Sequence, residues 1–168
     1  MKITPIFHIL SVLIMPLSGF MMVSGFVDFV YNNQNWINFF ISATITLFVG
    51  MSVFLATRGH NDQNIDLRQA FVLTTMSWIT IAFFGALPFY LSNINLGFTD
   101  SFFESMSGIT TTGSTILINI EESPPGILAW RSLLQWLGGI GVIVMAIAIF
   151  PMLSVGGMQL FKAENFEN

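Results

Sequence analysis

Four small polar residues and one glycine stand together at positions 110–114, inside the stretch GITTTGST at 108–115. Threonine carbonyls and hydroxyls are oxygen ligands of moderate field strength, and several of them around an axis can replace the water shell of a potassium ion. Threonine favours an extended backbone that aligns successive carbonyls, while Gly113 permits a positive φ and has no Cβ to obstruct the path. The stretch is therefore a candidate cation filter, with an ordinary threonine-rich loop as the alternative.

A charged pair could anchor this stretch. Arg131 lies at the start of an apolar segment, where a cation is tolerated only if it reaches water or pairs with an acid. Glu104, Glu121 and Glu122 are the available carboxylates. We expect the pair to anchor the candidate filter rather than to take part directly in permeation.

Acidic residues gather around the same region. A ring of negative charge would concentrate cations at a pore mouth. Single acidic residues in loops more commonly cap helices or keep a loop solvated, and both interpretations stay open. The residues concerned are Asp28, Asp100, Glu104, Glu121 and Glu122.

The composition indicates a membrane protein. Of the 168 residues, 54% are hydrophobic and 8% are charged, whereas soluble domains carry about a quarter charged residues. Long apolar runs without strict alternation favour helices over a barrel. Four segments are long enough to cross a bilayer, at about 4–29, 36–56, 67–91 and 126–153. The first is too long for a signal peptide and is predicted to be a retained transmembrane helix.

Residues 92–125 are too polar to span a membrane and too apolar for a free loop. We predict a short helix with Thr99 as N-cap, Asp100 in the first turn and Gly108 as the stop. Its apolar face comprises Phe102, Met106 and Ile109. An extended return follows, and the two together form a re-entrant hairpin.

The predicted fold is an all-α polytopic membrane protein in four parts. Residues 1–57 form an N-terminal transmembrane hairpin and 58–66 a cytoplasmic loop. Residues 67–157 form an outer helix, a re-entrant pore helix with an extended filter, and an inner helix, and 158–168 form a cytoplasmic tail. Pro151 and the glycines after it are expected to end the inner helix. Three glycines in that helix predict close helix packing or, as the alternative, a gating flexure: Gly138, Gly139 and Gly141.

Basic and aromatic residues predict the orientation. With a cytoplasmic N-terminus, four of the five basic residues fall on the cytoplasmic side, as the positive-inside rule requires. They are Lys2, Arg58, Arg68 and Lys162. Four aromatic residues then fall at the outer interface: Tyr31, Trp36, Tyr90 and Trp130.

Several classes of function find no support in the residues. The chain has no cysteine, so it can form neither a disulfide nor a thiolate site. His8 and His60 lack companions at metal-ligand spacing. No catalytic constellation or phosphate-binding loop is present, so we expect no enzyme activity and no cofactor. The net charge of −4 gives no reason to expect a nucleic-acid partner.

Three stretches carry a family resemblance: FFESMSGITTTGSTI, WRSLLQWLGGIGVIVMAIAIFPML and GGMQLFKAE. They resemble the first pore repeat of the bacterial Trk potassium-uptake family, the membrane subunits of the TrkH/KtrB/HKT superfamily. The resemblance implies a four-fold pseudo-symmetric pore in which Thr111 and Thr112 bind potassium through their backbone carbonyls. Thr110, Gly113 and Ser114 would line the filter.

The resemblance also implies partners and a location. These are membrane lipid, a homo-oligomer of the full-length protein, and a cytoplasmic nucleotide-binding regulatory subunit of the TrkA type, in the bacterial inner membrane. Because the sequence contains one repeat, we expect it to be the N-terminal part of a longer protein. A homotetrameric cation channel and a non-conducting membrane scaffold are the alternatives.

Overall fold

The computed structural model describes residues 3–59 and 67–164, and within them the regular structure is helical, without strands. The elements are α1 (Thr4–Val30), α2 (Trp36–Thr57), α3 (Leu67–Gly85), α4 (Leu87–Leu91), α5 (Phe98–Ile109), a 3₁₀ turn η1 (Ile120–Glu122) and α6 (Pro125–Glu164). Four stretches of the described chain could cross a membrane: Thr4–Val30, Trp36–Thr57, Arg68–Leu91 and Pro125–Val144. The predicted all-α polytopic fold is confirmed, with the first three spans correct to within one residue.

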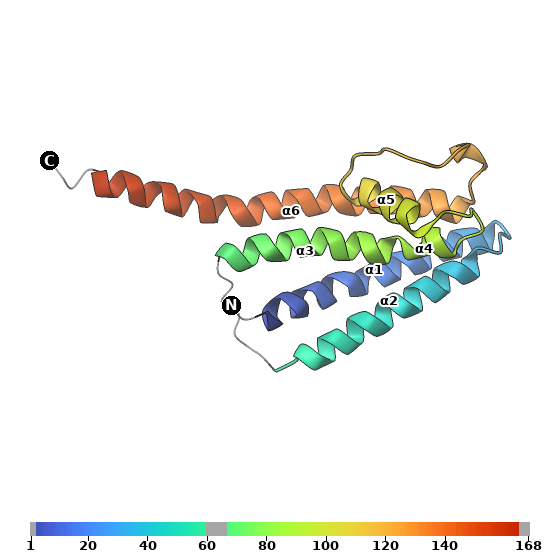
Figure 1. Ribbon diagram of the computed structural model, residues 1–168, viewed down its shortest axis with the longest axis horizontal. Coiled ribbons are helices and arrows are strands. Elements are labelled where there is room, and N and C mark those ends of the chain that lie inside the picture. Colours follow the sequence, from blue (N-terminus) through green and yellow to red (C-terminus); the bar gives the residue numbers. More distant parts are fainter. Residues whose placement is uncertain (1–2, 60–66, 165–168) are drawn as a thin grey trace.

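The four long segments lie side by side along one axis (Figure 1). Helices α1 and α2 form an antiparallel hairpin, and both α3 and α6 pack against α1. The short helix α5 lies beside the first part of α6, where the return segment loops outward before α6 begins. This end of the bundle, at the right of Figure 1, also carries the α1–α2 connection and is called the filter end below.

A break in the third span follows from proline. Helix α3 ends at Gly85 and α4 begins at Leu87, with Pro88 in its first turn. Proline has no N–H to donate and is favoured only at a helix start. The backbone bonds from Ala86 to Ala82 (3.0 Å) and from Tyr90 to Ala86 (2.9 Å) keep the two helices nearly continuous.

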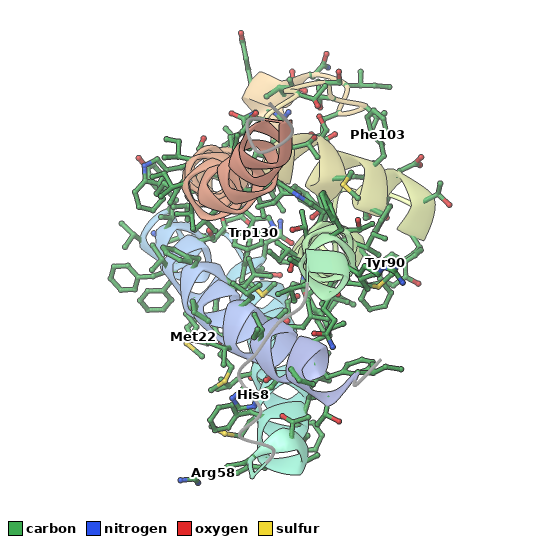
Figure 2. The ribbon with its side chains drawn as sticks, turned by 90° about the vertical axis from the view of Figure 1, so that its left-hand side faces the viewer. His8, Met22, Arg58, Tyr90, Phe103 and Trp130 are labelled. Atoms are coloured by element: carbon green, nitrogen blue, oxygen red, sulfur yellow. The ribbon has the colours of Figure 1, made fainter. Side chains whose placement is uncertain are left out.

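Trp130 fills the space beside this break, which corrects its predicted place at the membrane interface. It is 0% exposed, and its indole Nε1 donates to the Gly85 carbonyl at 2.9 Å. In Figure 2 Trp130 lies among the helices, whereas Tyr90 points outward. An indole can sit in an interfacial belt or in a core that offers its N–H an acceptor, and a carbonyl beside the helix break favours the core.

The buried core lies towards the filter end, where all the long segments and α5 meet. Phe39 of α2 packs edge to face on Trp130 of α6, with ring centroids 6.5 Å apart. Ile109 of α5 belongs to this core, and Phe102 and Met106 pack against it. The predicted apolar face of the short helix is therefore confirmed.

The inner helix does not end at Pro151, contrary to the prediction. Helix α6 continues through Pro151 and the glycines after it to Glu164. A proline inside a helix costs about 3 kcal/mol. Helix α6 nevertheless runs through Pro151, because a proline removes one backbone hydrogen bond of a helix and leaves the others in place.

Candidate functional site

Helix α5 brings the chain to the candidate filter. Its N-cap is Gly97, whose carbonyl accepts from the Ser101 N–H at 2.9 Å, and no side chain caps it. The predicted cap at Thr99 is therefore wrong, because the extended backbone of Gly97 (φ −65°, ψ 163°) starts the helix earlier. Asp100 lies in the first turn, as predicted, where a carboxylate opposes the positive end of the helix dipole.

Gly108 does not end this helix, which continues to Ile109 with Thr110 as the C-cap. A Cβ on Gly108 would lie 3.0 Å from the Cβ of Leu134 in α6. The absence of a side chain therefore lets the end of α5 approach α6 closely. Gly108 was predicted to end the helix, whereas its role in the structure is to allow this close packing.

The backbone reverses sharply after α5. Thr111 has φ +59° and Gly113 has φ +76°. The positive φ predicted for Gly113 is confirmed. Thr111 was expected to have an extended backbone, and this prediction is wrong. A β-branched residue in the left-handed region costs about 1–3 kcal/mol, and such a residue persists only where its surroundings enforce it.

Carbonyls at the end of α5 enforce this turn. Ser107 O accepts from the N–H groups of Thr112 (3.0 Å) and Gly113 (3.3 Å), and Gly108 O accepts from Thr111 N–H (3.0 Å). These are carbonyls that a helix end leaves unpaired. Pairing them with the next residues bends the chain back over the helix terminus.

Ser107 also holds the far side of the turn. Its hydroxyl donates to the Ser114 carbonyl at 2.6 Å, so that carbonyl is turned towards α5. Within the described chain, the carbonyls of Thr111 and Thr112 accept no hydrogen bond, and both residues are exposed. The two oxygens expected to bind potassium are therefore open to a ligand.

The hydroxyls of Thr110 and Thr112 lie 2.9 Å apart and bond to each other. A Cβ added to Gly113 would have Gln135 Nε2 of α6 as its nearest neighbour, at 3.8 Å. There is room for a side chain at Gly113, so the need for glycine comes from its positive φ.

Glu104 holds the extended segment that leaves the turn. This carboxylate is 1% exposed, and it accepts from the Thr115 hydroxyl (3.0 and 3.1 Å), the Ile116 N–H (3.1 Å) and Arg131 Nε (2.5 Å). Charge-assisted hydrogen bonds of this kind are roughly twice as strong as neutral ones. One buried carboxylate thus links α5 to α6 and to the segment that follows the turn.

The five acidic residues do not form one exposed ring. Glu104 is buried in the cluster just described, and Asp28 is 0% exposed. Asp28 Oδ1 accepts from the Gly126 N–H at 2.6 Å, so this carboxylate caps α6, a position that the helix dipole favours. Asp100, Glu121 and Glu122 remain at the surface.

The inner-helix glycines differ in their surroundings. A Cβ on Gly138 would overlap the Ile109 carbonyl at the end of α5, whereas nothing lies within 4 Å of one on Gly139 or Gly141. Close packing therefore explains Gly138. The gating flexure remains a prediction for the other two.

Residues that sequence reasoning missed are Ser107 and Thr115. Ser107 lies three residues after Glu104, which places both on neighbouring positions of one helix face, so helical spacing could have found it. Thr115 carries no such signal, because its partner is eleven residues away.

The predicted absence of a metal-binding histidine can be compared only in part. His8 Nδ1 lies 2.9 Å from the Thr57 hydroxyl, far from α5, and its ring stacks on Phe54. His60 lies outside the described residues. Among the residues whose side chains the structure describes, no group of three His, Asp or Glu could hold a metal ion.

Comparison with known proteins gives consistent matches. The TrkH family, described as cation transport proteins, matches residues 35–167. The Trk system potassium uptake protein TrkI of Halomonas elongata is 44% identical over 161 residues, which are 96% of this chain and 32% of that protein. The Trk system potassium uptake protein TrkH of Escherichia coli K12 is 39% identical over 165 residues, 98% of this chain and 34% of that protein.

A solved structure matches as well. The crystal structure of the potassium transporter TrkH from Vibrio parahaemolyticus superposes with a TM-score of 0.86 at 33% identity, covering 99% of this chain and 36% of that one. The chain therefore spans about a third of the length of the relatives it matches. With its family match, its relatives and its fold in agreement, this chain belongs to the TrkH family of cation transport proteins.

Proposed function

We propose that this chain supplies one quarter of the potassium filter in the pore-forming subunit of a Trk-type uptake system. Thr111 and Thr112 would bind the ion through their carbonyls, with Thr110, Gly113 and Ser114 lining the path. The observation that carries the proposal is the pair of free, exposed carbonyls at the C-terminal end of α5. The negative end of a helix dipole favours a cation at that place.

The relatives support potassium as the ion, because the printed names of TrkI and TrkH describe potassium uptake proteins. A single turn of carbonyls cannot surround an ion. The exposure of residues 110–116 on one side of the bundle fits a surface that other repeats would cover. Within the pore, α3 and α4 would form the outer helix, α5 the pore helix and α6 the inner helix, so that 67–157 act as one repeat.

Two other functions are compatible with the same fold. Four copies of this chain could form a homotetrameric channel, since the outer helix, short helix and inner helix make one complete quarter. A non-conducting scaffold would use the same turn without binding an ion. The cluster around Glu104 argues against the scaffold, because a plain surface turn does not require a buried ion pair with two further donors.

Membrane placement belongs to the same proposal. The chain would reside in the bacterial inner membrane with its N-terminus and the 58–66 loop in the cytoplasm and the filter end outside. Arg58 and Arg68 lie at the end opposite the filter, as the positive-inside rule requires. A TrkA-type nucleotide-binding subunit and a second copy of the pore subunit are the proposed partners. The chain would act as a transporter component without enzymatic activity or cofactor.

The proposal is tested by replacing Gly113 with serine in the complete pore. A side chain at φ +76° strains the turn and shifts the neighbouring carbonyls, so the preference for potassium over sodium should fall by about tenfold. Gly97→Ser is the matched control, because Gly97 has φ −65° and an added Cβ would lie 3.6 Å from Asp100 Oδ2. Uptake of both ions is measured at equal membrane levels. An unchanged ion preference in Gly113→Ser would contradict the filter assignment.

A further inference from the structure

Two buried polar side chains at the closed end of the α1–α2 hairpin reach into the rest of the chain. Asp28, in the last turn of α1, is 0% exposed, and its Oδ1 accepts from the Gly126 N–H at 2.6 Å. Asn35, the N-cap of α2, is 2% exposed, and its Oδ1 accepts from the Asn93 N–H at 3.1 Å. Neither contact is needed to close the hairpin itself.

These two contacts hold opposite ends of one segment. Asn93 stands at the entrance, directly after the C-cap of α4, and Gly126 stands at the exit, in the first turn of α6. The segment between them contains α5, the candidate filter and η1. Figure 1 shows the α1–α2 connection beside the end of α4 and the start of α6, at the right of the bundle. The hairpin therefore contacts the filter-bearing segment at both points where it joins the membrane helices.

The fit at Gly126 leaves little freedom. A Cβ there would overlap the Asp28 carboxylate and the Ser24 carbonyl. The first N–H groups of a helix have no partner within it, so the carboxylate satisfies a donor that would otherwise be unpaired. Hydrogen bonds fix distance and direction, whereas the burial of aliphatic side chains in the core is not directional.

The second oxygen of Asp28 argues for a role in positioning. Oδ2 is buried and has no hydrogen-bond partner in the described chain. Burying an unsatisfied charged oxygen is unfavourable, and an apolar side chain could pack at such a site at lower cost. Stability alone does not account for an aspartate here.

We propose that Asp28 and Asn35 are positioning residues for the filter, and that the N-terminal hairpin braces the two ends of residues 93–126. The brace fixes the distance between these two ends. This distance determines how α5 packs against the segment that follows the turn, and therefore how the carbonyls of Thr111 and Thr112 are oriented. This inference rests on the proposed function of residues 110–114 as a potassium filter.

The test uses the complete pore in cells that depend on potassium uptake. Asp28→Ala and Asn35→Ala each remove one acceptor, while Asn35→Asp keeps the oxygen that accepts from Asn93. Gln34→Ala is the matched control, since Gln34 is exposed in the same turn and its side chain makes no hydrogen bond within the described residues. Gly113→Ser serves as the filter reference. The ratio of potassium to sodium uptake and the potassium KM and Vmax are measured at matched membrane levels.

We expect both alanine variants to lower the potassium-to-sodium ratio by about threefold or more, the scale of coupling between a remote contact and a site. Asn35→Asp and Gln34→Ala should keep the parental ratio. If the alanine variants keep it while Gly113→Ser changes it, the brace is overturned and the filter stands. If Gly113→Ser keeps it as well, both proposals fail.

If an alanine variant inserts poorly into the membrane, two longer side chains test the same contacts. Asp28→Glu retains the charge but moves the carboxylate by one methylene against Gly126, where no space is available. Asn35→Gln moves the other acceptor in the same way. Both should reach the membrane with a lowered ratio. An unchanged ratio in these two variants would overturn the brace.

Discussion

Replacement of Glu104 by glutamine tests how the extended segment after the candidate filter is held. Glu104 accepts four contacts on two oxygens, from Thr115, Ile116 and Arg131. Glutamine has nearly the same shape but only one acceptor oxygen, and its amide directs two donors at groups that also donate. At least one donor of this cluster must therefore lose its partner.

The size of the effect follows from burial. Breaking one side of a buried ion pair costs about 3–5 kcal/mol. Because the Arg131 side chain is 15% exposed, water can satisfy part of it, and we expect a loss of about 2–3 kcal/mol. Thermal unfolding of purified protein in detergent, followed by intrinsic fluorescence, should show a clear fall in midpoint. Glu121→Gln, at an exposed position in η1, should show none.

A double variant distinguishes loss of the Glu104–Arg131 ion pair from a nonspecific loss of stability. In Glu104→Gln with Arg131→Met, the unpaired cation is gone, so the combined loss should be smaller than the sum of the single losses by about 1 kcal/mol or more. If residues 110–114 form the proposed filter, the potassium preference of the complete pore should also fall in Glu104→Gln, because the segment that follows them loses a hydrogen-bond partner. Equal stability of Glu104→Gln and Glu121→Gln, or strict additivity in the double variant, would refute this account of the cluster.

Two further predictions concern packing and topology. Gly138→Ala places a Cβ against the Ile109 carbonyl and should destabilise the protein by about 1–3 kcal/mol, as overpacking does, whereas Gly139→Ala, with nothing within 4 Å, should be neutral in the same unfolding measurement. A cysteine introduced at Asn61 should resist a membrane-impermeant thiol reagent in intact cells, because the basic flanks of this loop favour a cytoplasmic location; rapid labelling would contradict the proposed orientation.

The membrane spans could be predicted because apolar runs and the polar turns between them are local features of the sequence. The need of Arg131 for an acidic partner near the candidate filter also followed from local chemistry, since a charge in an apolar segment requires a partner. The pairing itself needed the structure, which selects Glu104 over Glu121 and Glu122.

Other features depend on contacts between distant parts of the chain. The left-handed backbone of Thr111 results from the carbonyls at the end of α5, and the propensity of threonine indicates the opposite conformation. Asp28 and Trp130 have side chains suited to a surface as well as to a core with a partner. Their partners, Gly126 and Gly85, are 98 and 45 residues away, beyond what any local pattern encodes.

The most direct test of the filter assignment is to locate the bound ion. Thallium(I) resembles potassium in charge and size and scatters X-rays anomalously, so crystals of the complete pore grown in thallium report its sites. We predict an anomalous peak on the pore axis, in contact with the carbonyl oxygens of Thr111 and Thr112 and reduced by competing potassium. A pore that conducts potassium but shows its thallium peaks away from these two carbonyls would contradict the central claim.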